Sequence, residues 1–256
     1  MKKFISVSAS SLNSFFCCSQ MFKWQFIDER PIDEAYIFTI YGSVLHKVFE
    51  LHFKFKYSLE DIKIAWPLLL TSVLSETKGL KFPEESVLKD KIMLGLKQIK
   101  NMEQMKERWK DYEILEVEKY VKIPFKNSFL ENVFLTGKID LLLKNAVNLV
   151  CLDWKSSKSK EKEIESNTQI TFYSFFIREL YKCSLDSIFG ALAYPFDGEI
   201  LFTQRSDDDF FNLFKKINNM LERIKNKDFI KEPKLNSRLK DCFFCQYKKT
   251  CAINVN

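Results

Sequence analysis

The sequence is poor in glycine, with 6 Gly among 256 residues, and it lacks any long apolar run. No apolar stretch approaches the roughly 20 residues that cross a bilayer. Residues 1–7 are too short in apolar length for a signal peptide. The absence of a glycine-rich phosphate loop excludes a P-loop ATPase in this chain. We therefore expect a cytoplasmic (intracellular) protein with no membrane partner.

The rest of the composition is that of an ordinary folded protein. Hydrophobic residues make up 46% of the chain and charged residues 29%, and the 25 Phe fit core filling at helical and strand spacing. A chain of 256 residues buries a sizeable core, and we expect one unit over residues 1–256. The net charge of +6 favours an anionic partner without requiring one.

The spacing of apolar residues predicts a helical first half and a mixed second half. Ser8 and Ser10 precede apolar residues at helical spacing, which is typical of a capped helix start near residue 10. Later runs that are β-branched and alternating indicate strands. Further helices are predicted over residues 41–55, 59–76, 84–109, 163–181 and 207–226, and strands over residues 114–125, 133–143, 148–155, 187–194 and 199–202.

Two of these strands form a predicted hairpin that carries acidic residues. Asn145 and Asn148 bracket its turn, and a hairpin centred between them places Asp140 directly opposite Asp153. Opposed Cβ atoms in an antiparallel pair lie about 4.5–5.5 Å apart, where two carboxylates repel unless a cation separates them. Strand alternation puts Lys155 on the same face as Asp153. The two carboxylates and the lysine are therefore a candidate metal-dependent site.

These residue types suit the hydrolysis of a phosphodiester. Carboxylate oxygens hold a divalent metal, which polarises the phosphate and lowers the pKa of a bound water. Lys155 would orient that water or stabilise developing negative charge, while Trp154 points to the opposite face and into the core. The alternative, an exposed strand face with surface charges, applies to most isolated Asp-x-Lys triplets. The neighbouring motifs decide between the two.

Four motifs, in this order, resemble those of the RecB-family nucleases in the PD-(D/E)XK superfamily. The resemblance implies an α/β, restriction-endonuclease-like core with a central mixed sheet flanked by helices, a helical N-terminal half and an iron–sulfur-bound C-terminal tail. Within it we expect a helical insertion over residues 59–110 and a catalytic sheet and helix over residues 112–205. The motifs are Gly42-Ser43-Val44-Leu45-His46, Gly137-Lys138-Ile139-Asp140, Asp153-Trp154-Lys155 and Gln169-Ile170-Thr171-Phe172-Tyr173.

The resemblance also implies a role for each site residue. Mg²⁺ or Mn²⁺ is expected to bind His46, Asp140, Asp153 and the main-chain carbonyl of Trp154. Lys155 matches the catalytic lysine. The remaining catalytic candidates, which support the site or the DNA from one helix face, are Gln169 and Tyr173.

Two further residues on the helix of His46 are less informative. His52 is offset from His46 onto a different helix face, so we interpret it as a packed or surface residue. Glu50 lies one turn after His46. It is either a partner of the metal ligand or a solvated helix charge.

Three of the seven cysteines lie together near the end of the sequence. Cys242, Cys245 and Cys251 have a spacing that suits a metal centre and leaves one ligand missing. Residues 8–22 resemble the N-terminal motif of the iron–sulfur subgroup found in AddB-type and CRISPR-associated adaptation exonucleases, and this resemblance implies that residues 1–30 supply the fourth ligand. The matching residue is Cys18, with Ser19 in place of the usual proline.

This resemblance implies a 4Fe-4S cluster that ties the N-terminal helix to residues 236–256. Cys17 is the alternative to Cys18, and a zinc ion fits the same four thiolates equally well by chemistry alone. We interpret Cys151 and Cys183 as buried structural thiols.

The subgroup implies a DNA exonuclease that acts on single strands or on DNA ends. The alternative is a DNA-end-binding module that keeps the fold, has weak or no turnover and needs a partner protein in recombination or CRISPR adaptation. A helicase or a CRISPR adaptation protein is the expected partner, since unwinding by ATP hydrolysis needs another chain. A third hypothesis is a zinc-stabilised structural protein.

Overall fold

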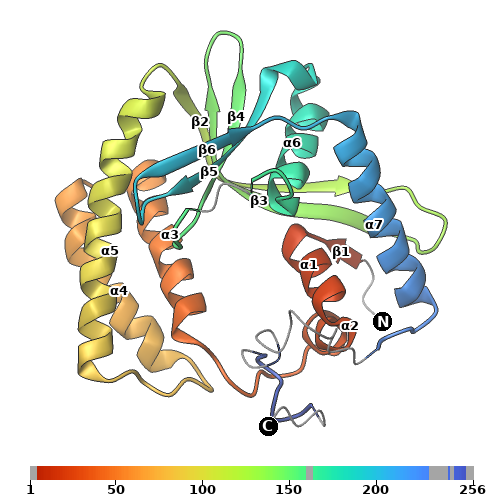
Figure 1. Ribbon diagram of the computed structural model, residues 1–256, viewed down its shortest axis with the longest axis horizontal. Coiled ribbons are helices and arrows are strands. Elements are labelled where there is room, and N and C mark those ends of the chain that lie inside the picture. Colours follow the sequence, from red (N-terminus) through yellow and green to blue (C-terminus); the bar gives the residue numbers. More distant parts are fainter. Residues whose placement is uncertain (1–4, 160–163, 231–241, 243–244, 252–256) are drawn as a thin grey trace.

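The computed structural model describes residues 5–159, 164–230, 242 and 245–251. It has a six-stranded mixed sheet (Figure 1). Five strands follow the order β1-β3-β4-β5-β6, and β2 pairs with β3 along the edge opposite to β1 and β4. β1 and β4 run parallel to β3 and β5 respectively, and the other pairs are antiparallel. The strands are β1 (Ile5–Val7), β2 (Glu113–Pro124), β3 (Val133–Lys144), β4 (Leu149–Trp154), β5 (Ile188–Tyr194) and β6 (Glu199–Thr203).

Strand β3 changes its neighbour part-way along its length. On one edge β2 follows it almost from end to end. On the other edge, β1 pairs with residues 133–135 and β4 pairs with residues 141–144. Residues 136–140 therefore have no strand partner on that edge, and the sheet opens there.

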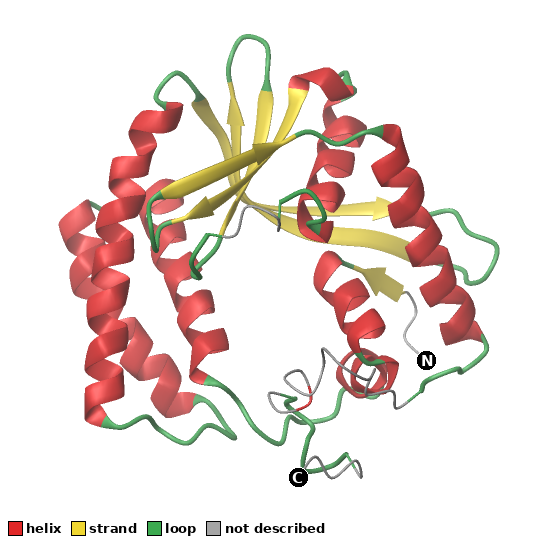
Figure 2. Ribbon diagram, viewed as in Figure 1, coloured by secondary structure: helices red, strands yellow, loops and turns green. Residues whose placement is uncertain are grey.

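Helices cover both faces of this sheet (Figures 1 and 2). α1, α6 and α7 contribute to the core on one face, and α3, α4 and α5 to the core on the other. The predicted helical first half is thus divided between the two faces. The α-helices are α1 (Ala9–Cys17), α2 (Ser19–Phe22), α3 (Ile37–Phe55), α4 (Leu59–Glu76), α5 (Glu85–Met105), α6 (Thr168–Tyr181) and α7 (Asp207–Lys225).

Serine caps define where three of these helices begin. Ser8, Ser58 and Ser206 each accept a hydrogen bond from the main chain three residues on, and the side chain at that position returns a bond to the cap. Such reciprocal pairs satisfy main-chain donors that a helix start leaves open. The predicted start near residue 10 is confirmed by α1.

The predicted helices and strands are confirmed, with differences at their ends. α3 begins at Ile37, four residues before the prediction, and the last turn before β2 is a 3-10 helix, η2 (Lys106–Trp109). α6 begins at Thr168 because Asn167 caps it, with Oδ1 accepting from the N–H of Ile170. The three-residue β1 was missed, since so short a strand has no alternating pattern.

No helix in the described residues combines the length and apolarity that a bilayer crossing needs.

A close contact between α4 and α5 makes Gly95 sensitive to substitution. Trp66 of α4 is fully buried, and a Cβ at residue 95 would lie 2.1 Å from its ring. We expect Gly95→Ala to lower the free energy of unfolding by about 1–3 kcal/mol, because overpacking outweighs the gain in helix propensity. Denaturant unfolding measures this. The control Lys100→Ala, at an exposed position of α5, should stay within about 0.5 kcal/mol, and an unchanged midpoint for Gly95→Ala would contradict the packing.

Candidate metal and nuclease site

The β3–β4 hairpin brings the two predicted aspartates together. Asn145 forms the turn, with Oδ1 accepting from the N–H groups of Val147 at 2.9 Å and of Asn148 at 2.7 Å. The register Leu141↔Leu152 confirms the predicted centre of the hairpin. One step further along, Asp140 faces Asp153, and both side chains are buried.

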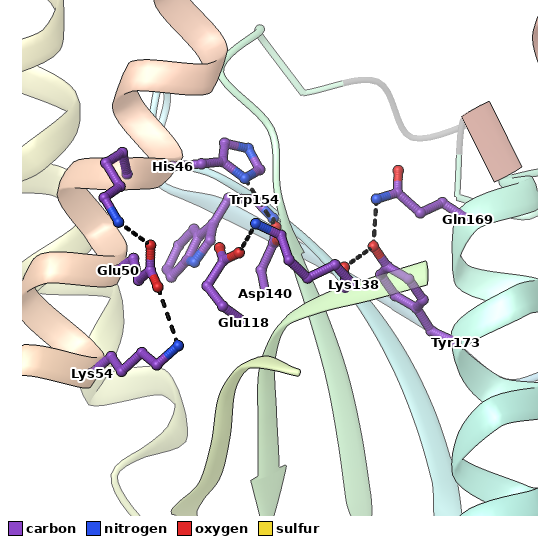
Figure 3. Close-up of polar contacts among 10 residues, drawn as sticks. His46, Glu50, Lys54, Glu118, Lys138, Asp140, Trp154, Gln169 and Tyr173 are labelled. Carbon is purple, nitrogen blue, oxygen red and sulfur yellow. Dashed lines mark hydrogen bonds and ion pairs between the residues drawn. The ribbon is translucent and has the colours of Figure 1, made fainter. Parts of the chain in front are cut away.

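Asp140 lies at the opening beside β3. Its Oδ2 accepts a hydrogen bond of 2.8 Å from the N–H of Trp154. This carboxylate takes the place of the β3 carbonyl that would pair with the Trp154 N–H in a continuous ladder. His46 Nδ1, from α3, lies 3.3 Å from the same oxygen. Figure 3 shows His46 directed toward Asp140. The site therefore joins α3 to the splitting point of the sheet.

Lys155 connects the acidic pair to helix α6. Its Nζ lies 2.7 Å from Asp153 Oδ2 and donates to Gln169 Oε1 at 3.1 Å. Gln169 Nε2 donates to the Tyr173 hydroxyl at 2.6 Å, and this hydroxyl donates to the carbonyl of Lys138 on β3 (Figure 3). The i,i+4 pair on α6 thus holds the lysine against the strand that carries Asp140.

Trp154 anchors the end of β4 on the opposite face, as predicted. Its ring lies 4.9 Å from that of Phe49, 5.8 Å from that of Phe53 and 5.9 Å from that of Trp109. Only 3% of Trp154 is exposed. Because neighbouring strand residues point to opposite faces, this anchor directs Asp153 and Lys155 away from the aromatic cluster.

Helices α3 and α5 both approach Ser156, which directly follows Lys155. A Cβ on Gly42 would lie 3.3 Å from Ser156 Oγ, so the glycine permits the close approach that places His46 one turn later. Gln98 of α5 is fully buried and donates to the Ser156 carbonyl at 2.8 Å. Asn101, on the same helix, donates to the carbonyl of Pro195 at 2.8 Å.

Glu118 of β2 belongs to the site and was missed from the sequence. Ligand atoms of His46, Glu118 and Asp140 all lie within 4.8 Å of one another. The loop joining β2 to β3 is too long to specify a register, and so the position of Glu118 opposite Asp140 had no signal in the sequence. Its carboxylate forms an ion pair with Lys138 (Figure 3).

The electrostatics of the site favour a bound cation. Burial and then the charge of Asp140 raise the pKa of Asp153 to about 6, although Lys155 acts in the opposite direction. Burial lowers the pKa of His46, but Asp140, Asp153 and Glu118 outweigh burial and raise it to about 9. The carboxylates of the site therefore carry more negative charge than the neighbouring cationic side chains neutralise.

Comparison with known proteins identifies the family. A family model described as the PD-(D/E)XK nuclease superfamily matches residues 6–252. The chain belongs to this superfamily. No curated protein matches the sequence. Among solved structures, the crystal structure of SSO0001 has a TM-score of 0.34 and 10% identity, covering 94% of this chain and 96% of its own, a likeness too weak to carry an argument.

Members of the PD-(D/E)XK superfamily are generally nucleases that use Mg²⁺ or Mn²⁺, and the site residues fit such an ion. The ligand atoms of the site are carboxylate oxygens and one imidazole nitrogen, which suit these metals. Asp153 is 1% exposed, and its Oδ1 has no hydrogen-bond partner among the described residues. A buried carboxylate oxygen without a donor is satisfied when a cation binds it.

The other residues of α3 that the sequence singled out do not contact the Asp140 carboxylate. Glu50 pairs with Lys47 at 2.7 Å and Lys54 at 3.2 Å, as a helix charge with its own partners. His52 Nδ1 lies 2.8 Å from the carbonyl of Tyr57, and its Nε2 lies 3.2 Å from Glu103. The prediction that His52 lies apart from the site is confirmed.

The cysteine segment lies near the N-terminal helices. Burial raises the pKa of the Cys245 thiol, and the nearby Cys18, Cys251 and Cys242 raise it further. The other three predicted ligands therefore lie near Cys245, although among the described residues no three cysteine sulfur atoms lie within 4.8 Å of one another. Cys18 ends α1 and caps α2, with its Sγ accepting from the N–H of Met21 at 3.4 Å.

Polar contacts hold this segment against residues 24–34. Asp33 accepts from the Thr250 N–H at 2.7 Å and from its hydroxyl at 2.8 Å, and its own N–H donates to the Gln246 carbonyl at 2.8 Å. The rings of Trp24 and Tyr247 are 5.8 Å apart. Of the predicted cluster segment, residues 236–241, 243–244 and 252–256 lie outside the described part of the chain.

The remaining cysteines differ from each other. Cys151 is fully buried and burial raises the pKa of its thiol to about 12, which confirms the interpretation as an unreactive core residue. Cys183 is less buried than predicted: it packs against the same core cluster but is only half-buried and lines a surface pocket beside Arg178 and Asp186. It follows the end of α6, where the chain turns at the surface.

The buried Asp153 should destabilise the metal-free protein. Its pKa is raised in the folded state, so the ionised form favours the unfolded chain above about pH 6. We expect Asp153→Asn to raise the free energy of unfolding in EDTA at pH 8 by about 1–3 kcal/mol. Denaturant unfolding measures this change.

Asp197→Asn is the matched control, because the Asp197 carboxylate accepts bonds of 2.9 and 2.7 Å from Ser159 that lower its pKa. This variant should lose about 1 kcal/mol. Destabilisation by both substitutions would contradict the electrostatic description of Asp153.

Proposed function

We propose that this protein is a metal-dependent DNA exonuclease that hydrolyses phosphodiester bonds in single strands or at DNA ends. The observation that carries the proposal is the position of Lys155, whose Nζ lies between Asp153 Oδ2 at 2.7 Å and Gln169 Oε1 at 3.1 Å. This ammonium stands directly beside the carboxylates that suit a divalent metal. The superfamily supports DNA as the substrate.

In this proposal His46, Asp140, Asp153 and the Trp154 carbonyl hold Mg²⁺ or Mn²⁺. When bound, the ion polarises the phosphodiester and makes the attacking water more acidic. Asp140 also accepts the Trp154 N–H at 2.8 Å, which keeps the end of β4 beside the ligand set. The protein thereby orients its ligands before substrate arrives, and such preorganisation lowers the barrier.

Lys155 acts on the attacking water and on the phosphate. Its ammonium donates a hydrogen bond that orients the water and stabilises the negative charge developing on phosphate oxygens. Gln169 Oε1 accepts one hydrogen bond from this ammonium, and Gln169 Nε2 in turn donates to the Tyr173 hydroxyl at 2.6 Å. These two residues of α6 therefore keep Lys155 on the side of the metal ligands.

The exonuclease assignment rests on the resemblance to the iron–sulfur subgroup. The net charge of +6 is compatible with DNA and does not distinguish ends from internal sites. A function together with a helicase or a CRISPR adaptation protein, and an intracellular location, stay predictions from the sequence.

Digestion of labelled DNA tests the activity. With Mg²⁺ or Mn²⁺ we expect the protein to shorten linear single-stranded DNA, and Lys155→Ala to lower the rate by about 100-fold or more, because one preorganised donor to the transition state is lost. The control Lys182→Ala, on an exposed lysine paired with Glu179, should keep the wild-type rate.

Circular single-stranded DNA distinguishes the two modes of cutting. Resistance of the circle supports an exonuclease, and its degradation supports an endonuclease. Binding of DNA ends without any shortening, by protein whose metal site is loaded, would instead favour the end-binding module.

We further propose that Cys18, Cys242, Cys245 and Cys251 hold a 4Fe-4S cluster with a structural role. The effect of the other three thiols on the pKa of Cys245 supports a shared site, because thiolates brought together repel unless a cation binds them. Cys18 is among the thiols that raise the pKa of Cys245, and this favours Cys18 as the ligand. The cluster would join the α1–α2 junction to the end of the sequence.

Protein purified without oxygen should be brown and contain iron and acid-labile sulfide in equal amounts. Cys18→Ser should lose most of both and lower the thermal midpoint, because the tie between distant segments is removed. Cys17→Ser is the adjacent control and should keep its iron. Colourless protein that contains zinc would support the zinc alternative and contradict the cluster.

A further inference from the structure

Gln98 of α5 is a polar residue that lies wholly inside the protein, with 0% of its surface exposed. A buried amide is costly unless its oxygen and its N–H groups find partners. The Tyr41 hydroxyl, from α3, donates to Gln98 Oε1, and Gln98 Nε2 donates to the Ser156 carbonyl at 2.8 Å. Two hydrogen bonds in series therefore run from α3 through α5 to the main chain just after β4.

The chemistry of the two partners gives the Gln98 amide one orientation. A main-chain carbonyl only accepts, so the amide nitrogen must face Ser156 and the amide oxygen must face Tyr41. Burial raises the pKa of Tyr41, so its hydroxyl keeps the proton that it donates. The Tyr41 ring is itself held in place, because its centroid lies 5.2 Å from that of Trp66 and 5.4 Å from Lys91 Nζ.

The bond from Gln98 is made directly beside Lys155. The N–H of Lys155 donates to the Ala193 carbonyl of β5 at 2.8 Å, just past the end of β4. Beyond this point the chain leaves the sheet, and Gln98 holds the Ser156 carbonyl instead. The main chain is thus bonded on both sides of the Lys155 Cα. Because the side chain extends from that atom, the direction of the ammonium depends on both bonds.

We propose that Gln98 is a positioning residue for Lys155, through which α3 and α5 contribute to the rate of hydrolysis. This inference rests on the proposed function and extends it to a residue that acts through the main chain. Gln169, by contrast, bonds to the ammonium itself. A displacement of about 1 Å in a catalytic group lowers the rate by about 100-fold, even when the altered residue lies away from the reacting atoms.

Asn101 offers a matched comparison on the same helix. It follows Gln98 by one turn, and its Nδ2 donates to the Pro195 carbonyl at 2.8 Å, just past the end of β5. Each residue gives one amide bond to one main-chain carbonyl that follows a central strand. Loss of either bond costs stability. Only the bond from Gln98 adjoins Lys155, so only its loss should move the ammonium.

Steady-state digestion of single-stranded DNA with Mg²⁺ separates positioning from stability. We expect Gln98→Met to lower kcat by about 10-fold or more and to change KM by less than about twofold, because transition-state contacts are lost and substrate binding is not. Asn101→Leu should lower the thermal midpoint to a similar extent and keep the wild-type kcat. Tyr41→Phe leaves the Gln98 amide oxygen without its donor and should lower kcat by about threefold.

Hydrogen exchange of the Lys155 N–H, followed by NMR, reports on the same part of the chain without any turnover. We expect Gln98→Met to speed this exchange by about 10-fold, because the loop after the N–H opens more often. In Asn101→Leu the exchange rate should change by no more than about twofold.

Equal losses of kcat in Gln98→Met and Asn101→Leu would overturn the positioning role and leave the nuclease intact. Wild-type kcat in Gln98→Met would do the same, and if that variant fails to fold, Tyr41→Phe decides in its place. A folded, metal-loaded wild type that leaves DNA intact would instead overturn the proposed function. Exchange at Lys155 then decides whether Gln98 fixes this part of the chain, since an unchanged rate in Gln98→Met overturns that as well.

Discussion

Buried negative charge is the constraint on which the rest of the site depends. Asp140 and Asp153 face each other with 4% and 1% of their surfaces exposed, in a sheet whose interior offers them few donors. The fold opposes their repulsion with a main-chain N–H on one carboxylate and an ammonium on the other. In the proposed nuclease a bound cation would offset the stability that this repulsion costs, an exchange that is common at functional sites.

The opening in the sheet makes this arrangement physically possible. Because β3 pairs with β1 at one end and β4 at the other, Asp140 stands where neither strand competes for its surroundings. α3 and α6 cover opposite faces of the sheet (Figure 2). From these helices His46 reaches Asp140, and Gln169 reaches Lys155. A continuous ladder along β3 would leave no room for these side chains.

Much of this arrangement was predictable from the residues alone. The turn at Asn145 determines the hairpin register, so the pairing of Asp140 with Asp153 followed from counting residues. Lys155 and Trp154 followed from strand alternation. The family model confirms the superfamily that four short motifs indicated.

Other features depend on tertiary contacts that leave no local pattern. The position of Glu118 requires the register across a long loop, and β1 is too short to show alternation. Gln98 is an unremarkable helix residue in the sequence and only its burial against Ser156 reveals what it touches. Cys183 is less buried than predicted because its exposure depends on how the chain leaves α6.

Gln98 and Asn101, both on α5, donate to the main-chain carbonyls of Ser156 and Pro195, which follow the ends of β4 and β5. Because both acceptors belong to the main chain, these two bonds depend on the path of the backbone and not on the side chains at positions 156 and 195. The two amides therefore couple the position of α5 to the backbone at the ends of the two central strands, one of which carries Asp153.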